Sequence, residues 1–260
     1  MINSPLVSVI MPAYNAELFI EEAILSVIHQ QHKNWELWII DDASTDKTLS
    51  KIEAFLADPR IHLLKNKTNR GTAFSRNLGI KKSTGTYIAF LDADDLWFPE
   101  KLEQQLDFMK THDQKMCFSS YLLLNEDGTS SQKMVEALPV LSYKKLQKSN
   151  YVGNLTGIYN VQVLGKIYSP ELRKRQDWGL WLKVLEKTGT VKGILKPLAF
   201  YRIRRDSISR YKTGLVKYNF LIYKKLLGYN YLKSCFWMLI FLKEHFFVKK
   251  NQLKNFTDAK

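Results

Sequence analysis

The sequence has few cysteines and no long apolar run, and both absences narrow the class of protein. Cys117 and Cys235 are the only cysteines in 260 residues, which excludes a disulfide framework and matches no metal-ligand spacing. The longest uninterrupted apolar run, 235–242, is far shorter than the ~20 residues that cross a bilayer. The N-terminus has no basic region before an apolar stretch, as a signal peptide would. We therefore expect a cytoplasmic protein in a reducing compartment.

The positive charge of the chain is unevenly distributed. The formal net charge is +14, and apolar residues make up 45% of the sequence, enough for one sizeable core. Residues 201–260 contain 14 Lys and Arg against 3 Asp and Glu. A basic segment of this kind indicates an anionic partner, either a membrane surface or nucleic acid.

Apolar segments with strand character alternate with segments of helical spacing in the first half. The strands are expected at 6–11, 36–41, 61–65 and 86–92, and helices follow Asn15 as an N-cap, Ser44 and Pro99. This alternation predicts an α/β fold with a doubly wound, mostly parallel sheet. Further along, a strand is expected at 115–124, a helix from Asp177, and two short strands with a basic loop across 190–209.

Polar clusters follow all four of the expected strands. They lie at 12–15, at 41–42, at 67–71 and at 92–95. Because the carboxyl ends of parallel strands meet at one edge, these clusters should lie together, where ligands bind in such sheets. We therefore expect a binding site at this edge.

Three aspartates within four positions, Asp92, Asp94 and Asp95, are the most unusual feature of that edge. Crowded carboxylates need positive charge among them, and a divalent cation or arginine partners are the two common solutions. A less specific interpretation is that Asp95 caps the following helix while the other two are solvated.

The order of four motifs resembles family 2 glycosyltransferases. They are VSVIMPAYN, WIIDDASTDKT, NRGTAFSRNLGIKKSTGTYIAFLDADD and QDWGLWLKV, and the resemblance covers about residues 5–210. It is most specific in the first 110 residues. NYVGNLTGIY, RQDWGLWLKVLEKTG and YRIRRDSIS are similar to bacterial enzymes that extend teichuronic acid, capsule or O-antigen chains. The resemblance implies a GT-A fold, an inverting reaction, a nucleotide-diphosphate-sugar donor, expected to be a UDP-sugar, and Mg²⁺ or Mn²⁺.

The same resemblance assigns a nucleotide pocket. Pro12, Ala13 and Tyr14 would line it, Asp42 would accept a hydrogen bond from the base, and Ala93 would present its backbone to the ribose. From the residues alone, Tyr14 is equally well explained by core packing.

The resemblance also assigns the residues around the metal and the diphosphate. Asp94 would be the principal metal ligand of a DxD motif, and Asp92 would support it directly or through water. Arg76 would pair with an acid of the site or with the nucleotide, and Arg204 would hold the diphosphate. The alternatives are an exposed helix charge for Arg76 and a basic surface loop for Arg204.

Asp177 matches the position of the catalytic base in the family, a carboxylate that deprotonates the acceptor hydroxyl. Gln176 stands where many relatives have glutamate, which is a departure from the family pattern. Without the resemblance, Asp177 would be interpreted as an N-terminal helix acid. Trp178 and Trp181 fit core packing better than stacking on a sugar. Two further candidates for acceptor contacts are Asn154 and Thr156.

Residues 211–260 form a tail in which aromatic and aliphatic residues alternate with lysines. We expect 1–210 to form the glycosyltransferase domain and 211–260 a basic amphipathic helix. That helix would lie on an anionic membrane surface, at the inner face of the cell membrane. The alternative is a helix that packs on the domain or on a partner subunit. A membrane location would suit an acceptor glycan linked to a polyprenyl diphosphate.

Three other functions fit the sequence less well than a glycosyltransferase does. A nucleic-acid-binding protein is supported by charge alone, since no groove-reading module is recognisable, and we expect no nucleic-acid partner. Another nucleotide-dependent transferase is disfavoured because this sequence has no glycine-rich phosphate loop after the first expected strand. An inactive binding module is disfavoured by the full set of acids.

Overall fold

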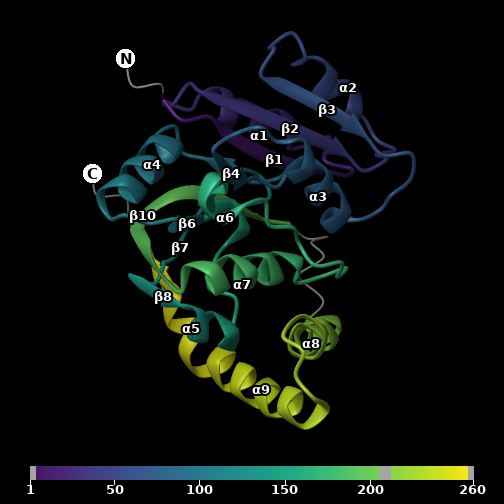
Figure 1. Cartoon of the computed structure of the whole chain (residues 1–260). Helices are drawn as coiled ribbons and strands as arrows, with labels where there is room; N and C mark the ends of the chain where they lie inside the picture. The colour runs from purple at the N-terminus through teal and green to yellow at the C-terminus, as the bar shows by residue number, and fades with distance from the viewer. Residues whose placement is uncertain (1–3, 205–211, 257–260) are drawn as a thin grey trace.

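A computed structural model describes residues 4–204 and 212–256, and Figure 1 shows their arrangement. The first half is a parallel sheet in the order β4-β1-β2-β3. The bounds of its strands are β1 (Val7–Ala13), β2 (Trp35–Asp41), β3 (Ile61–Lys65) and β4 (Tyr87–Phe90). The four expected strands are confirmed, although β4 ends two residues earlier than expected and leaves Asp92 in the following loop.

Alternate residues of β1 contribute to two different hydrophobic clusters, as expected when both faces of a sheet are covered. Val7, Val9 and Met11 belong to one cluster, and Ile10 belongs to the other. Helices pack on both faces, and their bounds are α1 (Ile20–Ile28), α2 (Thr48–Glu53), α3 (Thr72–Lys82) and α4 (Lys101–Thr111). The doubly wound arrangement predicted from the alternation of strands and helices is therefore confirmed.

The second half extends the sheet with mixed strands. β9 (Ile158–Asn160) is antiparallel to β4 and to β6 (Met116–Asn125), which also pairs with β7 (Ser130–Val135). The remaining elements of this part are β5 (Leu96–Trp97), β8 (Val140–Ser142), α5 (Tyr143–Lys148), the 3₁₀ helix η1 (Asn154–Thr156), α6 (Val161–Leu164) and α7 (Gln176–Thr188).

One strand, β10 (Thr190–Ile203), replaces the two short strands predicted for this region. It runs parallel to β6, and its register shifts on both sides of Pro197. Because proline cannot donate a hydrogen bond to a neighbouring strand, an irregularity at Pro197 lets the strand continue past it. The prediction of two strands was wrong, because one strand continues through the irregularity at Pro197.

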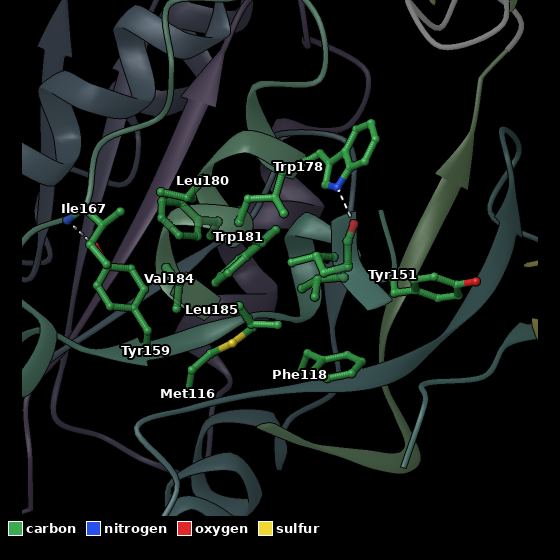
Figure 2. Close-up of a cluster of buried hydrophobic side chains, with 14 of the residues drawn as sticks. Met116, Phe118, Tyr151, Tyr159, Ile167, Trp178, Leu180, Trp181, Val184 and Leu185 are labelled. Carbon is green, nitrogen blue, oxygen red and sulfur yellow. Dashed lines mark hydrogen bonds between the residues drawn. The ribbon is translucent and has the colours of Figure 1, made fainter. Parts of the chain in front are cut away.

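The core between the sheet and the tail is built around α7. Figure 2 shows Trp178 and Trp181 among aliphatic and aromatic side chains, and both tryptophans are fully buried. The indole N–H of Trp178 donates to the carbonyl of Leu146 at 2.8 Å. Trp181 fills the space beside Gly157, where a Cβ would lie 2.3 Å from the indole ring. Core packing is therefore the role of both tryptophans.

Within the described residues, the tail contains two α-helices, each continued by shorter helical segments, and not the single helix that was predicted. Its elements are α8 (Lys212–Leu221), the π-helix η2 (Ile222–Leu226), α9 (Tyr231–Lys243), the π-helix η3 (Glu244–Val248), the 3₁₀ helix η4 (Lys249–Gln252) and β11 (Leu253–Asn255). The chain turns at Gly228, whose φ of 66° is unfavourable for other residues. Figure 1 places α8 and α9 at the end of the molecule farthest from α2 and β3.

The inner side of the tail belongs to the same hydrophobic cluster as α7. Tyr223 and Phe241 each contact the ring of Trp178, with centroids 5.9 and 5.7 Å apart. β11 adds an antiparallel strand to β7. The tail thus packs on the domain, which was the alternative interpretation, while its outer side remains exposed. The proposed boundary at residue 210 stays a prediction, since both parts share one core.

Two phenylalanines of α9 test how far the tail contributes to the fold. Phe241 is 5% exposed and Phe236 is 61% exposed. We expect Phe241→Ala to lower the free energy of unfolding by about 3–5 kcal/mol, because it leaves a cavity beside Trp178. Phe236→Ala should change it by less than about 0.5 kcal/mol. Urea unfolding of both variants measures this difference, and equal stabilities would show that α9 does not pack as described.

Candidate active site

Each aspartate that follows β4 has an arginine partner. Arg76 donates to Asp92 at 2.9 Å, and Arg204 donates to Asp94 at 3.1 Å. The backbone N–H of Arg202 donates to Asp95 at 3.0 Å. The six residues of these three pairs are Arg76, Asp92, Asp94, Asp95, Arg202 and Arg204. Of the two solutions expected for the crowded carboxylates, this structure shows arginine partners.

Arg76 lies in the middle of α3 and is almost completely buried. The alternative of an exposed helix charge is therefore wrong, and Arg76 pairs with Asp92, one of the acids predicted for the site. Two of its nitrogen atoms, Nε and Nη1, are buried without a hydrogen-bond partner among the described residues. Buried donors rarely remain unpaired, so these two are available to an anionic ligand.

Arg202 is a residue of the site that the sequence reasoning missed. It is buried, its Nε donates to the carbonyl of Asp94 at 3.0 Å, and its Nη2 pairs with Glu22 at 2.5 Å. It therefore holds both the Asp95 side chain and the backbone of the loop at 91–95, which we call the aspartate loop. The signal that could have found it is the spacing of two in YRIRR, which places Arg202 and Arg204 on one face of a strand.

Burial and mutual repulsion act on the aspartates together. Burial raises the pKa of Asp94, the charge of Asp92 raises it further, and Arg204 opposes the change. Burial and the charges of Asp94 and Asp92 also raise the pKa of Asp95 well above its usual range, against the effect of Arg202. This loop therefore favours additional positive charge. The helix-cap interpretation of Asp95 is wrong, because its carboxylate accepts a hydrogen bond from the backbone N–H of Arg202 in β10.

The two acids at the end of β2 have different roles. Asp42 is buried and accepts hydrogen bonds from the side chain of Asn66 and from the backbone N–H groups of Arg70 and Gly71, at 2.6–2.9 Å. Gly71 precedes α3 with a φ of 85°, which glycine adopts without strain. Asp41 is also buried, and its Oδ1 has no hydrogen-bond partner among the described residues. Asp42 is therefore occupied by the loop, whereas Asp41 keeps an acceptor available.

The residues at the end of β1 lie beside these acids. Pro12 and Ala13 are buried within β1, and Tyr14 is 47% exposed, so core packing is wrong for Tyr14. Asn15 has a φ of 47° and accepts from the backbone N–H of Thr45 at 2.9 Å. It does not cap α1, which begins after Phe19, so its predicted role was wrong.

Asp46 accepts from the backbone N–H groups of Thr48 and Glu17 at 2.9 and 3.1 Å. It thus ties the loop after β1 to the start of α2, where a carboxylate is favourable.

The loop of η1 covers the aspartates on another side. Asn154 is buried, and its amide donates weakly to Asp92 at 3.5 Å while its Oδ1 has no partner in the described ranges. The hydroxyl of Thr156 donates to the carbonyl of Gly153 at 2.7 Å. Ala93 is buried between the two metal-ligand candidates. Asn154 is therefore the better placed of the two candidates for ligand contacts.

Asp177 lies in the first turn of α7, where the helix dipole favours a negative charge. Its Oδ2 accepts from the side-chain amide of Asn150 at 2.8 Å. The Oε1 of the preceding Gln176 is buried without a hydrogen-bond partner among the described residues. The carboxylate is thus oriented by a neutral donor and keeps its other oxygen outside that bond.

Tyr121 links Asp177 to the aspartate loop. Burial raises the pKa of its hydroxyl, and the charges of Tyr201, Asp95 and Asp177 raise it further. The segment 150–154 gives the geometric link, because Asn150 donates to Asp177 at 2.8 Å and Asn154 donates to Asp92 at 3.5 Å. The structure therefore brings the predicted base and the predicted metal ligands to one region.

The carboxylates fit a divalent ion that shares its coordination with a substrate. Each arginine pair uses one oxygen, Oδ1 of Asp92 and Oδ2 of Asp94, and leaves the other outside the pair. Within the described residues, no three His, Cys, Asp or Glu side chains are grouped so that they could hold a metal ion. Mg²⁺ binds through one or two carboxylates when phosphate oxygens and water complete its shell. The donor set therefore fits a metal–diphosphate complex better than a metal bound by protein alone.

Comparison with known families agrees with this geometry. The family described as "Glycosyl transferase family 2" matches residues 8–167. This range includes the ends of β1 and β2, the aspartate loop and the η1 loop. The chain belongs to glycosyltransferase family 2. The resemblance inferred from the four motifs is thus confirmed, and the chain is a glycosyltransferase.

Two bacterial relatives align over nearly the whole chain. TuaG of Bacillus subtilis, named for teichuronic acid biosynthesis, is 38% identical over 235 residues, covering 89% of this chain and 93% of TuaG. WfgD of Escherichia coli is 34% identical over 256 residues, covering 96% of this chain and 98% of WfgD. WfgD is named as a UDP-Glc:alpha-D-GlcNAc-diphosphoundecaprenol beta-1,3-glucosyltransferase.

Solved structures share the fold. TarS of S. aureus, in complex with UDP-GlcNAc, has a TM-score of 0.71 at 22% identity, covering 94% of this chain and 74% of TarS. The mannosyltransferase PcManGT of Pyrobaculum calidifontis, in complex with GDP-Man and Mn²⁺, has a TM-score of 0.67 at 17% identity. The alignment covers 96% of this chain and 72% of the PcManGT chain. The GT-A fold with a helical C-terminal region is thus confirmed.

Proposed function

We propose that the enzyme is an inverting glycosyltransferase that moves a sugar from a UDP-sugar to a hydroxyl of a lipid-linked precursor of a cell-surface glycan. The supporting observation is that the segment 150–154 contacts both Asp177 and the arginine-paired Asp92. The names of TuaG and WfgD point to the same class of reaction, in teichuronic acid biosynthesis and on a diphosphoundecaprenol-linked sugar.

The nucleotide would bind at the ends of β1 and β2. Tyr14 is exposed and can stack on the base beside Pro12 and Ala13. The buried, unpaired Oδ1 of Asp41 is the better acceptor for an N–H of the base, because the oxygens of Asp42 already bond the loop at 66–71. We therefore revise the predicted contact from Asp42 to Asp41. Ala93 would present backbone to the ribose, as predicted.

The diphosphate of the donor would lie between the aspartate loop and the arginines. Arg204 and the unpaired nitrogens of Arg76 are suited to its oxygens, because guanidinium groups bind phosphates in a bidentate manner. Asp94 and Asp92 would hold Mg²⁺ or Mn²⁺, which neutralises the charge that develops on the leaving diphosphate.

Asp177 would act as the general base. Its carboxylate takes the proton from the acceptor hydroxyl as that oxygen forms a bond to the anomeric carbon of the donor sugar. The bond between this carbon and the diphosphate oxygen breaks on the opposite side, and the nucleoside diphosphate leaves. One displacement inverts the configuration at the anomeric carbon and needs no covalent intermediate.

The outer face of the tail would bind an anionic membrane surface. We define this outer face by the exposed apolar residues Leu232, Phe236, Leu239, Phe246 and Phe247 and the exposed lysines Lys224, Lys225, Lys233 and Lys243. An exposed apolar face of this size, bordered by lysines, is typical of an interfacial site. No helix of the described chain has the length and apolar character to span a membrane. Peripheral binding at the inner face would bring the enzyme to a lipid-linked acceptor.

The donor and the metal can be tested together by thermal unfolding. We expect a UDP-sugar to raise the melting temperature more than GDP-, dTDP- or CMP-sugars do, and Mn²⁺ or Mg²⁺ to increase that shift. Asp94→Asn should remove the metal-dependent part, whereas Asp107→Asn, an exposed aspartate of α4, should retain it. The assignment of the donor fails when no nucleotide sugar shifts the transition with either ion.

Asp177→Asn should reduce sugar transfer by about 100-fold to 10,000-fold, because the amide cannot accept the proton. The affinity for UDP in the presence of Mn²⁺ should remain unchanged, since Asp177 contacts the acceptor side only. Single-turnover transfer and calorimetric UDP binding measure the two effects. Wild-type turnover in this variant would exclude Asp177 as the base.

Membrane binding can be measured by sedimentation with phosphatidylcholine vesicles that contain or lack phosphatidylglycerol. We expect Phe236→Ser combined with Phe246→Ser to weaken binding by about tenfold for each phenylalanine lost. Val163→Ser combined with Leu195→Ser, which alters exposed apolar residues outside the tail, should have no effect. Equal binding of both double variants would exclude the outer face as the membrane site.

A further inference from the structure

Two cations lie beside Asp177: Arg175 is held by a residue of the tail, and Lys249 belongs to the tail. Arg175 precedes α7 with a φ of 65°, and its Nε donates to Asn219 of α8 at 2.8 Å. Lys249 of η4 donates from Nζ to the backbone carbonyl of Asn150. The side chain of Asn150 in turn bonds Asp177. Both cations therefore lie close to the proposed base.

One carboxylate, that of Asp177, acts on both cations, so the three groups together carry excess positive charge. Neither residue forms an ion pair with another of the described residues, and both side chains are partly buried. Burial lowers the pKa of Lys249 to about 8, and Arg175 lowers it further while Asp177 opposes the change. Burial also lowers the pKa of Arg175. Two partly buried cations that share a single carboxylate keep an excess of positive charge, which favours a bound anion.

Both side chains retain hydrogen-bond donors for such an anion. An ammonium group has three donors, and the hydrogen bond from Lys249 Nζ to Asn150 uses one. A guanidinium group has five, and Arg175 uses its Nε for Asn219. The backbone of Arg175 is in the left-handed region, which non-glycine residues rarely adopt and which is often found at functional sites. The site is thus electropositive and oriented by contacts from two elements of the tail.

We propose that Arg175 and Lys249 bind the diphosphate of a lipid-linked acceptor. This inference rests on the proposed function, in which Asp177 deprotonates the acceptor sugar. In a sugar-diphosphate lipid, one sugar ring separates the reacting hydroxyl from the diphosphate, so the anion must lie close to the base. The donor diphosphate has its own arginines, Arg76 and Arg204, at the aspartate loop. A second pair of cations, beside Asp177, therefore corresponds to a second diphosphate.

The proposal gives the tail a role in the chemistry as well as in membrane binding. Asn219 orients Arg175, and Lys249 contributes its ammonium group, so the acceptor site is incomplete without residues of α8 and η4. The outer face of α9 would contact the membrane that contains the lipid. The inner side would hold the diphosphate head of the same lipid.

Farnesyl diphosphate is a suitable probe for this site. The full-length protein is first saturated with UDP and Mn²⁺, which occupies the donor site, and is then titrated with the probe. We expect saturable binding, and we expect Lys249→Gln and Arg175→Gln each to weaken it about tenfold or more. Lys249→Arg should retain most of the affinity. Lys250→Gln, which removes an exposed charge from the adjacent position, should bind as the wild type does.

Farnesol and dispersed phosphatidylglycerol serve as control ligands, because they separate the diphosphate from the lipid chain and from a phospholipid headgroup. The proposal is overturned when farnesol binds as tightly as farnesyl diphosphate, when phosphatidylglycerol displaces the probe at equal concentration, or when both glutamine variants bind as the wild type does. UDP affinity, measured before the probe is added, verifies that each variant is folded. Absence of UDP binding by the wild type would instead overturn the proposed function, and this inference with it.

Discussion

The compensation of three aspartates by three arginines is the interaction on which the site depends. Asp92, Asp94 and Asp95 repel one another at the end of β4, and burial increases the cost of their charges. The arginines come from α3 and from the end of β10, which are far apart in the sequence. The aspartate loop can therefore adopt this conformation only when the sheet has brought both elements to it.

This arrangement also explains why the loop can accept a diphosphate. Arg76 and Arg204 each use part of their hydrogen-bonding capacity on an aspartate, and buried nitrogens of both lack a partner within the described residues. The two guanidinium groups thus have more hydrogen-bond donors than the pairs use, in a partly buried setting where they interact strongly with anions. Arg202 differs from both, because its contacts with Asp94, Asp95 and Glu22 fix the loop rather than face a ligand.

Much of this could be predicted from local patterns, and the rest depends on contacts between distant segments. The parallel strands and the shared polar edge follow from hydrophobic periodicity and from Asp42, Asp92 and Asp94 at strand ends. The burial of Arg76 could not be predicted, because a mid-helix arginine is usually exposed and its partner Asp92 is distant in sequence. Asn15 was assigned to a cap by its residue type, whereas its positive φ and its bond to Thr45 arise from the packing of two loops.

The tail shows the same limit on a larger scale. Its composition indicates an interface-seeking segment, and the exposed Leu232 and Phe236 fit that interpretation, but composition does not indicate that Tyr223 and Phe241 pack on Trp178. Trp178 follows directly after Asp177, so the packing that holds the tail also fixes the start of α7. A displacement of α9 would therefore move the helix turn that presents the proposed base. The membrane-facing segment and the catalytic carboxylate are mechanically joined through one buried side chain.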